Sequence, residues 1–163
     1  LPVYFGNRNW HPFASETAEK MSQDGVRKVA VFATSAWGGY SACRQYDEDI
    51  QRMREHLAEQ GLPDIEFTKI RQFFDHPKFV AEMAAAVTEV WGQVPEEKKE
   101  STRLLFTAHS VPVAHDNVGG AEGDKNLYSR QVAEASRLVA AQAGISGYDL
   151  VSVSYTHLRA HET

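Results

Sequence analysis

Apolar residues follow two alternating patterns along the chain. Short apolar runs predict strands, and longer segments with apolar positions three or four residues apart predict helices. The predicted strands are residues 3–6, 28–33 and 65–70, a run that starts at 104 and ends before Pro112, and a run that starts at 148. The predicted helices are residues 12–24 and 47–60, a segment that starts at 77, and a segment around 132–139 that Gly144 ends. This alternation predicts an α/β fold with parallel strands and helices on both faces of the sheet.

Local signals set the limits of these elements. Gly25 and Gly61 follow the first two helices, where glycine commonly ends a helix. Asp75 is the expected N-cap of the third helix, with Pro77 in its first turn. Loops are expected at two polar segments, residues 95–100 and 117–126.

The pattern also predicts how the chain is divided. A helix ends in Gly-Leu-Pro-Asp at residues 61–64, which predicts one domain over 1–60 and a second over 61–151. Residues 152–163 are polar where a buried strand should continue, and they resemble the translated adaptor read-through that ends many metagenomic gene fragments. We therefore expect this tail not to be native. The first residue, Leu1, is not methionine and leads directly into a predicted strand, which we interpret as an excised start.

Composition narrows the class of protein. The chain has 163 residues, 42% of them hydrophobic, which is typical of a soluble globular domain. Its net charge of −5 disfavours nucleic acid as a partner. No membrane span or signal peptide is expected. A single cysteine, Cys43, excludes an internal disulfide and is typical of a reducing, cytoplasmic setting.

The candidate chemistry lies where predicted strands end. His109 stands at the end of the strand that starts at 104, and ligands of open α/β sheets bind at the carboxyl ends of the strands. A histidine there can accept a proton near neutral pH or ligate a metal. The alternative, a loop histidine bonded to backbone, is equally compatible with the sequence.

Other candidates follow the earlier strands. Ser35 and Trp37 lie in a loop of small residues that could bring a flat aromatic ligand close to the backbone. Tyr46 could point its phenol into the same crevice, and Arg8 could pair with a carboxylate. The alternatives are a tight connection and a solvated arginine. The pattern alone therefore predicts an α/β domain with a ligand crevice.

Five motifs together resemble the ferrochelatases. They are VYFGNRNWHP (3–12), ATSAWGGYS (33–41), FDHPKFV (74–80), FTAHSVP (106–112) and YSRQV (128–132). The chain most resembles the actinobacterial type that inserts iron into coproporphyrin III. The resemblance covers nearly all of residues 1–151 and corresponds to an internal fragment, roughly the second to fourth sixths of a full enzyme. It implies flavodoxin-like, chelatase-type sheets in parts of two lobes, with a porphyrin cleft between the lobes.

The resemblance also implies roles for individual residues. His109 matches the histidine that faces the macrocycle as metal ligand and proton acceptor, and Tyr46 matches a tyrosine that contacts the porphyrin. Arg8 matches an arginine of the inner site in some members, although Asn9 stands where those members have tyrosine. Cys43 matches the lone early ligand of a [2Fe-2S] cluster found in several members, but the other three ligands are absent from this chain. The acidic partner of His109 and the first porphyrin-binding segments also lie outside it.

Two hypotheses of different classes follow. The first is a cytoplasmic iron chelatase of haem biosynthesis that needs no cofactor, with a porphyrin and Fe²⁺ as substrates. The second is a non-catalytic tetrapyrrole- or metal-binding α/β module, and a cobalt chelatase of related fold is a third option. The fragment alone is expected to bind porphyrin weakly and to turn over little. The sequence does not indicate an oligomeric state.

Overall fold

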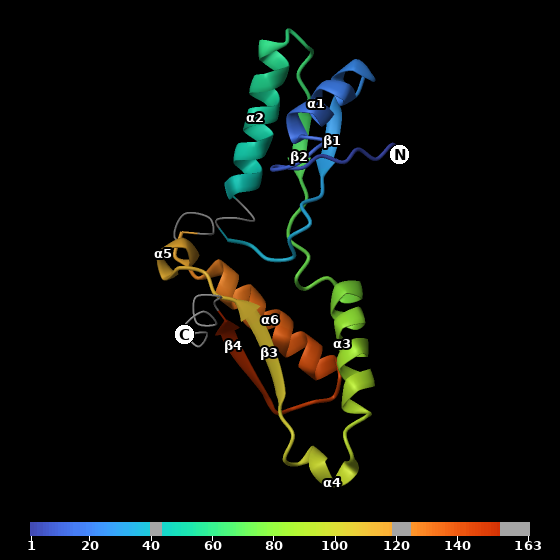
Figure 1. Cartoon of the computed structure of the whole chain (residues 1–163), viewed down its shortest axis with the longest axis vertical. Helices are drawn as coiled ribbons and strands as arrows, with labels where there is room; N and C mark the ends of the chain where they lie inside the picture. Colours follow the sequence, from blue (N-terminus) through green and yellow to red (C-terminus); the bar gives the residue numbers. More distant parts are fainter. Residues whose placement is uncertain (40–43, 119–124, 154–163) are drawn as a thin grey trace, which may run out of the picture. The chain divides into compact units, whose positions relative to one another are not determined.

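The chain forms two compact units. The computed structural model describes residues 1–39, 44–118 and 125–153 (Figure 1). Unit 1 consists of Leu1–Ser35 and Tyr40–Gln72, and unit 2 of Ala36–Gly39 and Phe73–Thr163. The predicted division at residues 60 and 61 therefore falls inside unit 1. The reason is that the strand following residue 61 pairs with the first strand and so belongs to the same sheet.

Unit 1 is a β-α-β arrangement preceded by a helix. Its elements are α1 (Ala14–Gln23), β1 (Lys28–Val31), α2 (Gln45–Glu59) and β2 (Glu66–Lys69). The two strands are parallel, with Lys28 opposite Glu66 and Val31 opposite Lys69. A parallel pair needs a crossover connection, and α2 lies within it.

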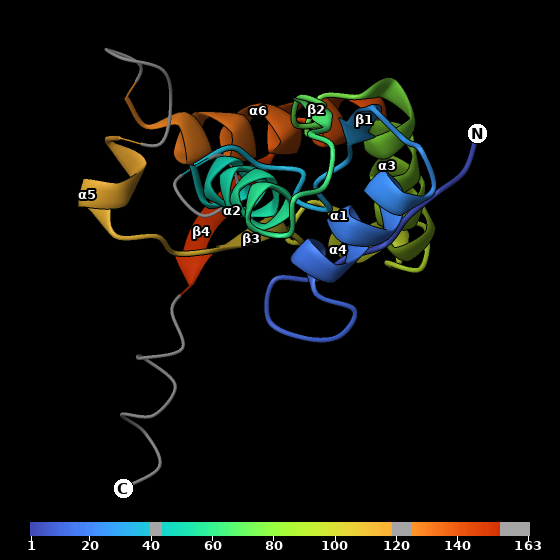
Figure 2. The ribbon, with the colours of Figure 1, turned by 90° about the horizontal axis from the view of Figure 1, so that it is seen from above.

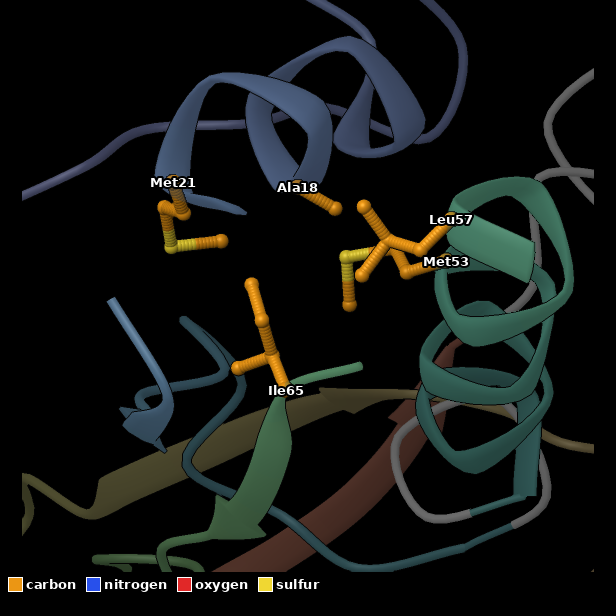
Figure 3. Packing of buried hydrophobic residues seen from close by; sticks show 5 residues of the cluster. All are labelled: Ala18, Met21, Met53, Leu57 and Ile65. Carbon is orange, nitrogen blue, oxygen red and sulfur yellow. The ribbon is translucent and has the colours of Figure 1, made fainter. Parts of the chain in front are cut away.

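The core of unit 1 is made by the apolar faces of its two helices and the start of β2. Figure 3 shows its five buried side chains converging: Ala18, Met21, Met53, Leu57 and Ile65. The helical members are spaced three and four residues apart within α1 and α2, so each helix presents one apolar face.

Unit 2 contains the remaining elements. They are α3 (Pro77–Trp91), α4 (Glu96–Lys99), β3 (Leu104–His109), α5 (Val113–Asp116), α6 (Leu127–Gln142) and β4 (Tyr148–Val153). The strands β3 and β4 are parallel, with Leu104 opposite Tyr148 and His109 opposite Val153. Helix α6 runs beside this sheet in both views (Figures 1 and 2). Its Val139 packs with Val80 and Ala84 of α3 to form the core.

The predicted α/β class with parallel strands is confirmed. Each sheet in the described part of the chain has two strands, and burial alternates along β1, β2 and β3, whereas β4 is exposed after its first residue. In β3, for example, Phe106 packs on the α3–α6 core while Leu105 on the other face is 54% exposed. Among the described residues, however, helices cover one face of each sheet, whereas the sequence predicted helices on both faces. No described helix is long and apolar enough to cross a membrane.

Several predicted limits of elements were wrong. Residues 3–6 form no strand, since the only pairing nearby in the described structure is a bridge between Asn7 and Phe13. His76, not Asp75, caps α3, because its ring Nδ1 accepts a hydrogen bond from the Lys78 backbone N–H at 3.2 Å. The first predicted loop, residues 95–100, contains the one-turn helix α4. The one-turn helix α5 ends at Asp116, directly before the second predicted loop. Strand β4 runs through Val153, two residues into the segment 152–163, whose origin stays a prediction, and residues 154–163 lie outside the described part.

Candidate active site

His109 ends strand β3 on the open face of its sheet. The side chains alternate along a strand, so His109 shares a face with Leu105 and Thr107. All three residues are exposed, whereas Leu104, Phe106 and Ala108 are half-buried. The His109 ring is therefore not turned into the α3–α6 core, and it can meet a ligand at the carboxyl end of the strand.

One hydrogen bond defines the tautomer of this ring. The His109 Nδ1 atom lies 2.7 Å from the backbone oxygen of Ser110. A carbonyl oxygen only accepts, so Nδ1 carries the hydrogen of the neutral imidazole. The lone pair is then on Nε2, which is the atom that can accept a proton or bind a metal. The structure therefore shows the backbone-bonded histidine that the sequence left open as an alternative, and in this neutral form the lone pair lies on Nε2.

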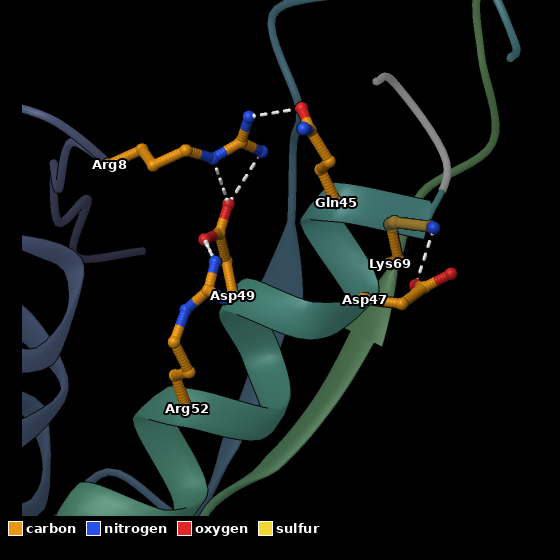
Figure 4. Close-up of polar contacts among 6 residues, drawn as sticks. All are labelled: Arg8, Gln45, Asp47, Asp49, Arg52 and Lys69. Carbon is orange, nitrogen blue, oxygen red and sulfur yellow. Dashed lines mark hydrogen bonds and ion pairs between the residues drawn. The ribbon is translucent and has the colours of Figure 1, made fainter. Parts of the chain in front are cut away.

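Arg8 and Tyr46 lie side by side in unit 1, and Figure 4 shows Arg8 with its polar partners on α2. The Arg8 guanidinium carbon lies 4.9 Å from the centroid of the Tyr46 ring. The same guanidinium donates from Nε to Asp49 at 2.7 Å and from Nη1 to Gln45 at 2.7 Å. Asp49 also accepts a hydrogen bond from Arg52. Arg8 is therefore held by a carboxylate of its own unit, and this cluster fixes it beside the tyrosine.

The loop after β1 leads into unit 2 through Trp37. The Trp37 ring packs edge-on against Phe79 of α3, with centroids 6.2 Å apart. Next to it, the Gly38 N–H donates to the side-chain oxygen of Gln131 on α6. Ser35 is half-buried at the end of the unit 1 segment. The structure thus assigns Arg8, Tyr46 and Ser35 to one unit and Trp37 and His109 to the other.

Two residues near His109 were missed by the sequence analysis. The Tyr128 phenol donates to the backbone oxygen of His109 at 2.8 Å. Partial burial raises the pKa of Tyr128, with a smaller contribution from the negative charge of Asp116. Asp116 is 7% exposed and accepts from the first turn of α6. The YSRQV motif was the available signal for Tyr128, but nothing local marked Asp116.

The metal-binding capacity of the described residues is small. No group of three or more His, Cys, Asp or Glu side chains gathers among them in a way that could hold a metal ion. A [2Fe-2S] cluster needs four protein ligands, usually cysteines, and the sequence contains one cysteine. That residue, Cys43, lies outside the described residues. The residues of this chain therefore do not fit such a cluster.

The fold and this histidine define a class: an α/β protein with parallel sheets and an imidazole at the carboxyl end of a strand. A sequence profile of the family described as Ferrochelatase matches residues 1–156. The chain belongs to the ferrochelatase family.

Curated relatives agree with this assignment. The chain is 56% identical over 151 residues to a coproporphyrin III ferrochelatase of Corynebacterium glutamicum, covering 93% of this chain and 40% of the relative. It is 58% identical over 158 residues to the coproporphyrin III ferrochelatase of Corynebacterium diphtheriae, covering 93% and 42%. The corresponding protein of Nocardia farcinica is 52% identical over 152 residues, again covering 93% and 42%. The chain thus spans about two fifths of the length of these relatives.

Proposed function

We propose that the protein containing this chain inserts Fe²⁺ into coproporphyrin III, or a related porphyrin, in haem biosynthesis. Membership of the ferrochelatase family and the names of relatives 52–58% identical support this proposal. The observation that carries it is the position of His109, exposed at the end of β3 with Nδ1 on the Ser110 oxygen.

The chemistry of metal insertion matches what this ring can do. Two pyrrole protons must leave the macrocycle for each Fe²⁺ that enters, so the net charge changes little. An acceptor with a pKa near neutral serves best, because it takes a proton readily and releases it to water. Nε2 of the neutral His109 ring carries a lone pair that can take up such a proton, and the same lone pair can bind the incoming Fe²⁺.

Porphyrin binding is proposed for Arg8, Tyr46, Ser35 and Trp37. The Arg8 guanidinium can pair with a porphyrin carboxylate, which would replace or share the contact that it makes with Asp49. The Tyr46 ring offers an aromatic face to the macrocycle. We also propose that units 1 and 2 are parts of the two chelatase lobes.

The requirements of this function are simple. The reaction needs no cofactor, and Fe²⁺ and the porphyrin are its substrates. We propose the cytoplasm as its location, in keeping with the single cysteine of the chain. The alternative hypothesis is a non-catalytic tetrapyrrole-binding module. It predicts binding of the porphyrin without turnover in the experiment below.

The test is His109→Ala in the complete gene product that contains this chain. Removing the proton acceptor should lower kcat for anaerobic Fe²⁺ insertion by about 100-fold or more. The Kd for porphyrin should stay within about threefold, because the porphyrin contacts are proposed for Arg8, Tyr46, Ser35 and Trp37 and not for His109. Absorbance of the metallated product measures the rate, and fluorescence quenching measures binding.

His56→Ala is the matched control. This histidine lies on α2 with its Nε2 3.4 Å from Glu19, and it has no proposed role in the reaction. Its kcat should stay close to the parent value. A His109→Ala protein with near-parental rates would refute the proposed role, and a parent that gives a stoichiometric spectral change without turnover would support the binding module instead.

A further inference from the structure

The peptide group between His109 and Ser110 is held on both sides. Its oxygen accepts a hydrogen bond from the Tyr128 phenol at 2.8 Å. Its N–H donates to the Val153 oxygen of β4 at 2.9 Å. These two bonds act at opposite ends of one planar unit, so together they fix its rotation.

The fixed peptide determines where the imidazole finds its acceptor. The His109 Nδ1 atom bonds to the carbonyl oxygen of Ser110, which belongs to the next peptide group. If the His109–Ser110 peptide rotates, the Ser110 carbonyl moves relative to the ring. The hydrogen bond from Nδ1–H to the Ser110 oxygen is then strained or lost. Without that hydrogen bond, the Nδ1–H tautomer, which has its lone pair on Nε2, is no longer favoured.

Tyr128 is itself held firmly at the start of α6. Its backbone N–H donates to Asp116 Oδ1 at 3.0 Å, and the Ser129 hydroxyl donates to Asp116 Oδ2. Asp116 is 7% exposed, so these bonds form largely away from water. Hydrogen bonds to a carboxylate are stronger than those between neutral groups. The position of the phenol is therefore set by the helix start.

Tyr128 also lies close to the loop that carries Trp37. A Cβ atom placed on Gly39 would lie 3.6 Å from the Tyr128 Cβ, which is ordinary van der Waals contact. Gly38 lies against Leu127, the residue before Tyr128. Tyr128 thus contacts both this loop and the backbone of His109.

We propose that Tyr128 is a positioning residue for His109, which keeps the ring in the Nδ1–H form with Nε2 as the proton acceptor. This inference rests on the proposed function, because it assigns a role in the same reaction. Tyr128 transfers no proton itself. Its hydroxyl donates a hydrogen bond to the His109 carbonyl oxygen, which accepts the bond but does not take up the proton.

The test is Tyr128→Phe in the complete gene product, with kinetics and ¹⁵N NMR of the histidine rings. The variant keeps the aromatic ring and loses only the hydroxyl. We expect kcat for Fe²⁺ insertion to fall about three- to tenfold while KM for porphyrin stays within about twofold. The neutral His109 ring should change from nearly all Nδ1–H to a mixture with the Nε2–H form. The signal is assigned from its absence in His109→Ala.

Two controls separate positioning from stability. Tyr4→Phe removes a phenol that donates to Asp24 at 2.9 Å in unit 1, and it should change neither kcat nor the tautomer. Val139→Ala removes buried methyl groups from the core of unit 2, on α6 but eleven residues after Tyr128. It should lower the free energy of unfolding without reproducing the loss of kcat or the tautomer mixture.

The outcomes distinguish this inference from the proposed function. If His109→Ala abolishes insertion but Tyr128→Phe leaves kcat and tautomer unchanged, the positioning role is overturned and the function stands. If His109→Ala retains the parent rate, the function itself is overturned. Should Tyr128→Phe fail to fold, the parent alone decides: a neutral His109 ring that is mostly Nε2–H would overturn the inference.

Discussion

Single side chains of this protein depend on close partners that lie far away in the sequence. Arg8 is held by Asp49, and the Tyr128 hydroxyl reaches the backbone of His109. Gly38 also depends on a distant residue, because it lies so close to Leu127 of α6 that there is no room for a side chain. An ideal Cβ there would lie 2.6 Å from Leu127 Cδ2 and 2.9 Å from Leu127 Cγ. At these distances the leucine or the loop must move.

Gly38→Ala should lower the free energy of unfolding by about 1–3 kcal/mol, the usual cost of overpacking. The added methyl group pushes the loop away from α6 and strains the bond from the Gly38 N–H to Gln131. Urea unfolding monitored by circular dichroism measures the change. Gly147→Ala is the matched control, since its Cβ would come no closer than 3.9 Å to its nearest neighbour, Arg103. Equal effects of the two substitutions would contradict the steric argument.

Whole elements are joined by a few polar contacts as well as by their cores. Helix α6 begins after Asn126, a residue with φ of 57°, and Asp116 of α5 caps its first turn from outside the helix. In unit 1, Arg54 of α2 donates two hydrogen bonds to Asp64, at 3.2 and 2.6 Å, just before β2. The contact between Arg54 and Asp64 joins α2 to the turn that leads into β2.

The contact between Arg54 and Asp64 predicts a pH dependence. Hydrogen bonds from the Arg54 guanidinium, helped by the Ile65 N–H, lower the pKa of Asp64 below its ordinary value. A carboxyl with a lowered folded-state pKa stabilises the fold above its unfolded pKa, about 3.9, and this contribution is lost as pH falls through the folded-state value. Arg54→Met should raise the pKa of Asp64 toward the ordinary value and make the loss of stability below about pH 4 shallower.

Carboxyl ¹³C shifts measure the Asp64 titration, and urea midpoints from pH 6 down to 2.5 measure stability. Because both side chains are about half exposed, the effect on stability should be small and should weaken with added salt. Arg52→Met is the control on the same helix, since Arg52 pairs with Asp49 instead. An Asp64 midpoint that is the same in the parent and in Arg54→Met would refute the assignment.

At the scale of the whole molecule, each unit carries its own hydrophobic core. Leu57 and Ile65, both 0% exposed, lie in the core of unit 1, and Val139, 1% exposed, lies in that of unit 2. Apolar residues also remain exposed on the β3–β4 sheet, among them Leu105 at 54% and Val151 at 44%. Stability therefore comes from these two clusters rather than from apolar content as such.

Leu57→Ala should lower the free energy of unfolding of unit 1 by about 2–5 kcal/mol, because it removes buried methyl groups and leaves a cavity. Native-state hydrogen exchange of the unit 1 amides measures this loss. Leu105→Ala, the same change at a residue that is 54% exposed, should cost the amides of unit 2 less than about 1 kcal/mol. Similar costs for the two substitutions would show that burial does not set the energetics here.

Much of the fold and part of the site were predictable from local sequence. The periodicity placed helices close to α1, α2, α3 and α6, and strands at β1 to β4. It also predicted that His109 stands at a strand end, because a strand pattern and the following Pro112 are local signals. The roles of Arg8, Tyr46, Ser35 and Trp37 stay predictions.

Tertiary structure alone decided which groups meet. Residues 3–6 have a strand-like pattern but form no strand, since a strand also needs a partner to bond its backbone. The division between the units falls at Gln72 because β2 pairs with β1, and Asp116 caps a helix that starts eleven positions later. The spacing of apolar residues determined the helices and strands, because each of them buries one face and the spacing that forms such a face differs between a helix and a strand. Partners and caps depend on hydrogen bonds between residues that only the folded chain brings within reach, such as Asp116 with Tyr128 and Tyr128 with the backbone of His109.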